Sequence, residues 1–171
     1  SLNQIIEKYP TSPYSDKARY EIGNAYLLLK DDDNALRSFD DMINKYPNSP
    51  MTAKAMLKAG LIDYNNDHND LALARLKKVI SKYPGSQEAR EALSTIKNIY
   101  VDMNRVQDFV AYSSTFKEGS ITSTEQDSLL YVAAESQYMK GNCEEGIRGF
   151  NAYLQQFPTG SFAVKAAWYK A

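Results

Sequence analysis

A short proline-containing phrase recurs along this chain at a fixed interval. It reads YPTSP at 9–13, YPNSP at 46–50, YPGS at 83–86 and FPTGS at 157–161. The prolines lie at positions 10, 47, 84 and 158, so the intervals are 37, 37 and 74 residues, the last being twice 37. A fixed period of about 20 to 50 residues is typical of a repeat array, in which each unit buries its apolar face against its neighbours. The chain is therefore expected to be built from one repeated unit, and such bodies commonly bind other molecules.

Each unit is expected to contain two helices. In the second half of a unit, apolar residues keep the spacing of one helix face. They are Ala35, Leu36, Phe39, Met42, Ile43 and Tyr46 in the first full unit, and Ala72, Leu73, Leu76, Val79, Ile80 and Tyr83 in the next. A preceding helix is expected at 13–30 and again at 50–66. Short polar connections at 30–34 and 66–70 make each unit a helical hairpin.

The recurring phrase combines a stop signal with a start signal. Because proline disfavours the α conformation in the residue before it, the second helix is expected to end near Tyr46. The Ser-Pro pairs at 12–13 and 49–50 are then expected to supply an N-cap and a first helical turn.

Small residues are expected to mark where the two helices of a hairpin cross. Gly23 with Ala35, and Gly60 with Ala72, would allow a close approach that a large side chain would prevent.

The period divides the chain into six segments. They are the second helix of a truncated unit at 1–11, full units at 12–48 and 49–85, a degenerate unit at 86–122, a further unit at 123–160, and the start of a truncated unit at 161–171. We expect one all-α array of helical hairpins over 1–171, excised from a longer protein.

The degenerate unit departs from the pattern at three positions. Lys97 stands at the register of Gly23, Phe109 stands at the register of Ala35, and Ser113 replaces an apolar residue. A looser or differently angled hairpin, or a bend, is expected there.

Composition excludes several classes of function. Lys plus Arg is 20 and Asp plus Glu is 21, mixed along the chain, so no basic face is available for nucleic acid. Apolar residues form no run near the 18 positions of a membrane span. The single cysteine, Cys143, excludes an internal disulfide.

The repeated positions resemble the tetratricopeptide repeat family. The residues that carry the resemblance are Ile22, Gly23, Tyr26, Ala35, Phe39 and Pro47, followed by Leu57, Gly60, Ala72 and Pro84 in the next unit. The family unit is commonly about 34 residues, and the three extra residues here fall between Pro47 and Ala53. This longer junction is similar to repeats of bacterial cell-envelope proteins, namely the periplasmic cell-division coordinator linked to the Tol-Pal system and outer-membrane assembly lipoproteins.

The resemblance implies an α-α superhelix (solenoid) whose first helices line a concave groove. It implies a non-catalytic scaffold that binds a protein or peptide there, in the periplasm or on the periplasmic face of the outer membrane. A cytosolic peptide-binding adaptor is the alternative. Aromatic and amphipathic side chains make good binding anchors. The candidate groove residues are Lys17, Tyr20, Asn24, Lys54, Leu57, Leu61, Glu91, Asn98, Tyr131, Glu135, Tyr138, Lys165 and Trp168.

Catalytic and metal-binding patterns are weak. Ser94 and Lys97 form the S-x-x-K string of penicillin-recognising enzymes, but the companion motifs are absent, so an acyl-transfer enzyme is a remote alternative. Cys143 has no histidine in its own unit, and a metal site needs more ligands than His68 offers. The acidic run Asp31–Asp33 lacks the spacing of a calcium loop and is expected to lead into a helix. No cofactor is expected.

Apolar residues gather near both ends of the sequence. They are Leu2, Ile5 and Ile6 at one end and Ala166 and Trp168 at the other. Because repeat arrays bury such faces against neighbouring units, end-to-end self-association is a further expectation.

Overall fold

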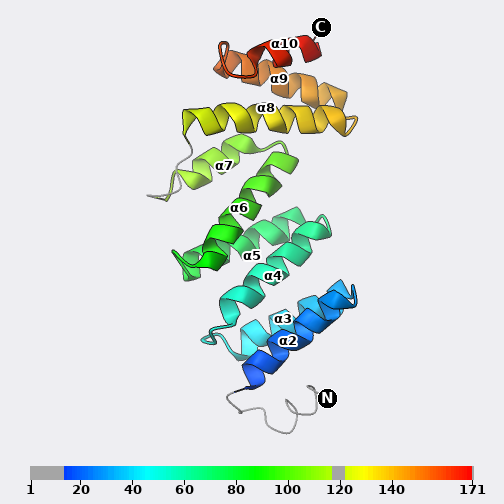
Figure 1. Ribbon diagram of the computed structural model, residues 1–171, viewed down its shortest axis with the longest axis vertical. Helices are drawn as coiled ribbons and strands as arrows, with labels where there is room; N and C mark the ends of the chain where they lie inside the picture. The colour runs from blue at the N-terminus through cyan, green and yellow to red at the C-terminus, as the bar shows by residue number, and fades with distance from the viewer. Residues whose placement is uncertain (1–13, 117–121, 171) are drawn as a thin grey trace. The chain divides into compact units, whose positions relative to one another are not determined.

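The computed structural model describes residues 14–116 and 122–170, whose course Figure 1 shows. All regular structure within these residues is α-helical, which confirms the expected fold class. The expectations for the helix start at 12–13, for the truncated helix at 1–11 and for Leu2, Ile5 and Ile6 lie outside the described residues. The helices are α2 (Ser15–Leu28), α3 (Asp32–Lys45), α4 (Thr52–Asn65), α5 (Asn69–Lys82), α6 (Gln87–Asp102), α7 (Val106–Ser113), α8 (Ser123–Met139), α9 (Cys143–Gln156) and α10 (Ala163–Lys170).

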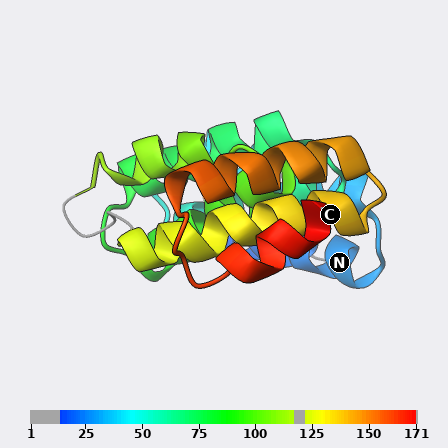
Figure 2. The same ribbon diagram turned by 90° about the horizontal axis from the view of Figure 1, so that it is seen from above.

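The chain forms two compact units, residues 1–96 and 97–171, whose boundary lies inside α6. In the first unit α2 packs against α3, α3 against α4, and α4 against α5. In the second unit α7 packs against α8, α8 against α9, and α9 against α10. Figure 2 shows α8 in yellow, α9 in orange and α10 in red running side by side. Among the described residues, no helix combines the length and apolar character needed to cross a bilayer.

Each first helix closes with the same turn. Four residues spaced 37 apart adopt a left-handed conformation, with φ of 57° at Lys30, 60° at Asp67, 55° at Asn104 and 87° at Gly141. The residue after each donates its N–H to the carbonyl five positions back, as Asp31 does to Tyr26 at 2.9 Å. This is the hydrogen bond of a Schellman C-cap, and it satisfies carbonyls that the helix end leaves free. The reversal is therefore built the same way in four successive units.

The connections inside the hairpins are shorter than expected. Residues 29–31 join α2 to α3, and residues 66–68 join α4 to α5. In the first case Asp31 caps α3, because its Oδ1 accepts the N–H of Asn34 at 3.1 Å and its Oδ2 accepts the Asn34 side-chain amide at 2.7 Å. The acidic run is thus drawn into the start of the helix, where its charge is favourable.

The second helices end where the prolines predicted. Tyr46, Tyr83 and Phe157 are the C-caps of α3, α5 and α9, with φ between −128° and −129° and ψ between 53° and 65°. The near-identity of these angles confirms the stop signal, since a residue before proline avoids the α conformation.

The predicted N-cap at Ser49 is wrong. Helix α4 begins at Thr52, and its N-cap residue is Met51. The Ser49 hydroxyl instead accepts the N–H of Met51 at 3.0 Å and donates to Asp16 Oδ2 on α2 at 2.5 Å. A bond to an earlier helix therefore holds this serine in the junction ahead of α4. At the next junction Ser86 does precede a helix, and its hydroxyl accepts the N–H of Ala89 at 3.0 Å.

A glycine facing a large side chain sets the spacing of the first two hairpins. A methyl group on Gly23 would lie 2.5 Å from Phe39 Cε1, and one on Gly60 would lie 2.8 Å from Leu76 Cδ2. The close approach is as predicted, but the nearest partners are Phe39 and Leu76 rather than Ala35 and Ala72 one turn earlier. Phe39 is fully buried in a core with Tyr20, Met42, Ala55, Ala59 and Ile62.

Arg75 joins three helices of the first unit. Its Nη1 and Nη2 donate to the two carboxylate oxygens of Asp40 on α3, at 2.5 and 2.9 Å. Its Nε donates to Oδ2 of Asp63 on α4 at 2.7 Å, and Asp63 is only 1% exposed. A planar guanidinium suits two carboxylates at once, so this group pairs a buried charge and ties one hairpin to the next.

The second unit has an aromatic core. Tyr131, Phe150 and Tyr153 are buried, and the Tyr131 ring lies stacked on Phe162, with centroids 4.5 Å apart and planes at 11°. The small residues have changed helices here: Gly149 on α9 faces Ala134 on α8, and a methyl on the glycine would lie 2.7 Å from the Ala134 Cβ. Helices α8 and α9 therefore still approach closely, although the glycine lies on the second helix instead of the first.

The degenerate unit differs in the length of its second helix. Helix α7 has 8 residues, against 14 in α3, α5 and α9. Phe109 is nevertheless buried beside Tyr100, with ring centroids 6.4 Å apart, and the buried Ser113 hydroxyl donates to the carbonyl of Val110 at 3.0 Å. The large and polar substitutions are therefore accommodated locally, and a looser hairpin remains a prediction.

Asp127 fastens the last junction to α8. Its Oδ1 accepts the Tyr153 hydroxyl at 2.5 Å, its Oδ2 accepts the N–H of Ser161 at 2.8 Å, and the Tyr153 hydroxyl accepts the N–H of Phe162 at 3.0 Å. Burial alone would raise the pKa of this carboxyl, but these hydrogen bonds outweigh burial and lower it below its ordinary value. Asp127 stands 111 residues, or three periods, after Asp16, which holds Ser49 in the first junction.

The glycine contact predicts the effect of one methyl group. Gly23→Ala should lower the free energy of unfolding by about 1 to 3 kcal/mol through overpacking against Phe39, although alanine is the better helix former by about 1 kcal/mol. Urea unfolding followed by circular dichroism measures the change. Ala25→Leu, which adds bulk on the exposed side of the same helix, is the control and should leave the midpoint in place. An unchanged or raised midpoint for Gly23→Ala would contradict the proposed packing.

The Asp127 contacts predict both a loss of stability and a pH dependence. Asp127→Asn keeps the shape but cannot accept from both donors, so stability at pH 7 should fall by about 1 to 3 kcal/mol. Because the folded pKa is lowered, the wild-type advantage is fully present above the ordinary aspartate pKa of about 3.9 and is lost as the pH falls through the folded value. Urea midpoints of the two proteins should therefore converge as the solution is acidified below that ordinary value. Glu144→Gln, at an exposed site of the same unit, is the matched control.

Candidate protein-interaction surface

Each first helix carries exposed or half-buried residues at the same four registers of the repeat. On α2 these are Lys17, Glu21, Asn24 and Leu28, whose spacing of 4, 3 and 4 residues places them on one helix face. Every residue at these registers in the described first helices is exposed or half-buried. We name the set the first-helix stripe. Its other members are Lys54, Lys58, Leu61, Asn65, Glu91 and Thr95 in the first unit, and Asn98, Asp102, Ser128, Val132, Glu135, Met139, Lys165 and Tyr169 in the second.

Eight of the thirteen predicted groove residues belong to the stripe. They are Lys17, Asn24, Lys54, Leu61, Glu91, Asn98, Glu135 and Lys165. These side chains are exposed or half-buried, so at least part of each is accessible to another molecule.

Three predicted residues lie inside the hairpins instead. Tyr20, Leu57 and Tyr131 are buried, and Tyr131 is only 1% exposed. Tyr20 packs against Phe39 with ring centroids 5.8 Å apart, and Tyr131 packs against Phe150 at the same separation. The reason is helical geometry: each of these residues directly precedes a stripe residue, and a step of one residue turns the side chain by about 100° around the helix, here towards the second helix. Their first role is to hold the hairpin.

The last two predicted residues have intermediate positions. Tyr138 is half-buried between Phe150 and Tyr169, with ring centroids 6.3 and 5.0 Å away. Trp168 is 73% exposed, although it shares its register with the three buried residues.

The residues that sequence reasoning missed include the stripe positions at the C-terminal ends of the helices. Leu28 is 86% exposed, and Met139, three periods later, is 68% exposed. Extending the run from Lys17 and Asn24 by four residues would have found Leu28. Large apolar side chains in such positions are available to anchor a partner.

In the first unit the stripe carries mixed charge. Lys54 and Lys58 lie one turn apart on α4, whereas Glu21 on α2 accepts the side-chain amide of Asn24 at 3.1 Å. Burial raises the pKa of the neighbouring Tyr20, the hydrogen bond with Asn24 opposes this, and the charges of Glu21 and Glu88 add to the rise. The surface therefore offers both signs of charge and suits a polypeptide better than a uniform polyanion.

In the second unit the stripe centres on Glu135. Its Oε1 accepts the Tyr131 hydroxyl at 2.5 Å and the Tyr169 hydroxyl at 3.3 Å, and it lies 3.9 Å from Lys165 Nζ. Burial, then this carboxylate, raises the pKa of Tyr131. The Lys165 ammonium also lies 5.7 Å from the centre of the Tyr131 ring. One carboxylate thus fixes α8 and α10 side chains together and leaves an ammonium at the surface.

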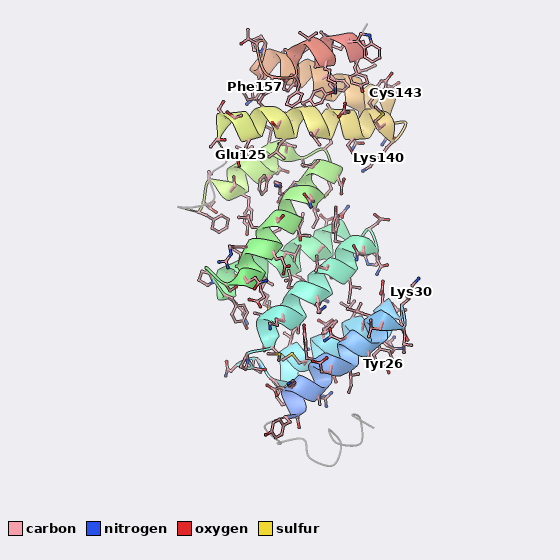
Figure 3. The ribbon with its side chains drawn as sticks, viewed as in Figure 1. Tyr26, Lys30, Glu125, Lys140, Cys143 and Phe157 are labelled. Atoms are coloured by element: carbon pink, nitrogen blue, oxygen red, sulfur yellow. The ribbon has the colours of Figure 1, made fainter. Side chains whose placement is uncertain are left out.

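Among the residues considered for chemistry, His68 and the acidic run Asp31–Asp33 line one hollow of the first unit. Cys143 is the exposed first residue of α9, and Figure 3 shows it with Lys140 at the turn between α8 and α9. His68 is exposed immediately before α5, and Ser94 is exposed on α6. Asp31 serves as a helix cap, and the hydrogen bonds from the side chain and backbone of Asn34 lower its pKa. In the described part of the chain, no group of three or more potential ligands is placed to hold a metal ion.

The fold and surface together define a repeat protein of helical hairpins, and comparison with known proteins gives its family. The tetratricopeptide repeat profile matches residues 17–49, 54–86 and 127–160, more than half of the chain. The chain therefore belongs to the tetratricopeptide repeat family, whose members generally mediate protein–protein interactions. Residues 87–126, which include α6 and α7, and residues 161–171, which include α10, lie outside the matched ranges.

Solved structures share the fold at low sequence identity. A tetratricopeptide repeat protein from Parabacteroides merdae ATCC 43184 is 16% identical with a TM-score of 0.59, and the match covers 96% of this chain and 61% of that one. The nearly identical repeats of a putative kinesin light chain from Podosopora anserina are 13% identical with a TM-score of 0.54, covering 99% and 86%. MamA is 14% identical with a TM-score of 0.52, covering 91% and 85%. A search of curated proteins gave no match.

The division between stripe and interior predicts opposite effects of neighbouring substitutions. Tyr131→Ala should cost about 3 to 5 kcal/mol of stability, as removal of a buried aromatic ring does. Val132→Ala, at the next residue but on the exposed side of α8, should change stability by less than about 0.5 kcal/mol. Urea unfolding monitored by circular dichroism compares them. Equal effects would show that the two faces are assigned incorrectly.

Proposed function

We propose that this chain is a non-catalytic scaffold whose first-helix stripe binds a segment of another protein. The observation that carries the proposal is the regularity of the stripe: the same four registers stay exposed or half-buried in successive first helices, while Tyr20, Leu57 and Tyr131 beside them are buried. Membership of a family that generally mediates protein–protein interactions supports it.

The composition of the stripe indicates the kind of ligand. The stripe contains lysines, glutamates and side-chain amides, with apolar residues near the C-terminal ends of two helices. Leu28 and Met139 are its most exposed apolar members. An extended or helical peptide can pair with charges and still bury apolar anchors. We infer that the ligand is a peptide segment of mixed character.

We further propose that the scaffold acts in a bacterial cell-envelope assembly. This proposal is supported by the Tyr-Pro-x-Ser-Pro junctions, which are similar to repeats of periplasmic and outer-membrane proteins. A cytosolic adaptor is the second candidate, since the same fold serves it equally well. Fractionation of native cells with antibodies to the full-length protein separates the two: recovery with the periplasm or outer membrane supports the envelope role, and recovery with the cytosol supports the adaptor.

The binding surface is tested by charge reversal in the full-length protein. Lys54→Glu with Lys58→Glu changes two stripe positions on α4, and should weaken capture of the native partner by about tenfold or more because charges that meet the ligand are inverted. Lys78→Glu with Lys82→Glu makes the same change in net charge at exposed sites on α5 and should leave capture unchanged. Circular dichroism confirms that both variants fold.

Photo-crosslinking identifies what lies on the stripe. A benzophenone amino acid at Leu28 of the first unit, and separately at Met139 of the second, should each join to a repeatable segment of a partner, and the same label at the exposed Leu71 on α5 should not. Equal labelling from all three sites, or capture that ignores Lys54 and Lys58, would place binding elsewhere.

A further inference from the structure

A hollow of about 400 Å³ lies in the second unit between α7 and α9. Its apolar lining consists of Val106 on α7, Leu130 on α8 and Ala152 on α9, and Gly149 on α9 adds a stretch of bare backbone. The volume falls within the range of about 300 to 1,000 Å³ that is usual for ligand pockets. Helices of two successive hairpins enclose the hollow, and the described chain continues on both sides of it, so its exposure does not come from an end of the array.

The hollow lies where the second unit lacks a bridge that the first unit has. In the first unit Arg75 on α5 reaches Asp40 on α3 and Asp63 on α4. Gly149 stands 74 residues, or two periods, after Arg75, and it has no side chain to reach across. The residues two periods after the two aspartates are uncharged. The space that an arginine spans in the first unit is therefore open beside Gly149.

The walls of the hollow are held before any ligand arrives. Gln107 Nε2 on α7 donates to Gln156 Oε1 on α9 at 3.1 Å, which ties one wall to the other. Val106 is only 2% exposed, and Leu130 packs against the aromatic core of the second unit. A ligand would therefore bind a site that is already formed, which lowers the cost of ordering on binding.

Two arginines line the hollow, one from each wall. Arg105 is the N-cap residue of α7, and Arg148 lies on α9. Arg105 Nε donates to Asp108 Oδ2 at 2.6 Å, and its guanidinium carbon lies 5.6 Å from the centre of the Tyr100 ring. Arg148 Nη2 donates to Oε1 of Glu145, three residues earlier on α9. The described residues that line the hollow thus carry two positive charges and one negative.

The ion pair of Arg148 does not prevent it from binding a further carboxylate. The pair with Glu145 joins two exposed side chains of one helix, and such pairs contribute little to stability. Arg75 shows that one guanidinium in this fold holds two carboxylates at once, those of Asp40 and Asp63. The five N–H donors of the planar group make this possible. Arg148 can therefore keep Glu145 and still bind a carboxylate that enters the hollow.

We propose that the hollow between α7 and α9 binds an acidic segment of a partner protein. An aspartate or glutamate of that segment meets Arg148 and Arg105, and an apolar side chain beside it covers Leu130 and Ala152. Charge complementarity selects the acidic residue, and the apolar lining selects its neighbour. The lining contains no residue of the first-helix stripe, so this site gives the scaffold a second point of attachment.

A peptide array supplies the probe. Hexapeptides whose two central positions run through all pairs of amino acids are incubated with the intact chain. The strongest spots are expected to combine an acidic residue with leucine, isoleucine or valine. A dye-labelled copy of the peptide in the strongest spot then gives a dissociation constant by fluorescence anisotropy.

Matched variants make the result specific. Arg148→Gln should weaken binding of this peptide by about tenfold or more, because it removes the cation that meets the carboxylate. Arg37→Gln removes the same charge at an exposed residue three periods earlier and should bind as the wild type does. Ala152→Phe fills the hollow from an exposed position and should also weaken binding about tenfold or more, whereas Ala111→Phe, exposed on α7 and outside the lining, should not. Circular dichroism checks that each variant folds.

Four outcomes would overturn the proposal. The array selects no acidic residue, or binding survives Arg148→Gln, or binding survives Ala152→Phe, or Arg37→Gln weakens binding equally. Loss of binding with Lys54→Glu and Lys58→Glu, in place of the variants at the hollow, would assign the peptide to the first-helix stripe. That result would remove the second site and leave the proposed function standing.

Discussion

The close approach of a glycine to the facing helix, seen in three of the hairpins, is the constraint on which their packing depends. Gly23 against Phe39 and Gly60 against Leu76 leave no room for a methyl group, and at Gly149 the close approach to Ala134 recurs with the helices exchanged. Close-packed interiors tolerate little change in volume, so these contacts set how near the two helices lie. Once that distance is set, the register decides which side chains face inward and which face water.

That division gives each face of a first helix a separate task. The positions of Tyr20, Leu57 and Tyr131 hold the second helix, and the positions of Lys17 and Asn24 remain at the surface. Packing residues and surface residues are therefore different sets, and the surface set can change without loss of the fold. This separation explains how one helical unit can serve as a scaffold for many partners.

The sequence predicted the features that depend on short-range backbone geometry. Proline placed the helix ends at Tyr46 and Tyr83 correctly, because its effect on the preceding residue is local. Ser49 was misassigned because its hydroxyl donates to Asp16, 33 residues earlier, and accepts the N–H of Met51, which holds it in the junction ahead of α4. Tyr131 was assigned to the surface because its aromatic character suits a binding anchor and a core equally, and only the packed hairpin separates these roles. The surface registers could be predicted from the 37-residue period. The left-handed turns could not, because only Gly141 among the four turn residues is a glycine, the residue type that signals positive φ.

The left-handed turn recurs at the same register of each hairpin, whatever the length of the second helix that lies between two turns. Asn104 adopts the turn 37 residues after Asp67, and Gly141 adopts it 37 residues later again, although the intervening α7 is only 8 residues long. The 37-residue spacing is therefore kept from one turn to the next, and a change in one second helix does not shift it. A shortened second helix such as α7 therefore leaves the position of the turn in the next unit unchanged. An array built in this way can diversify one unit at a time while the others keep their packing.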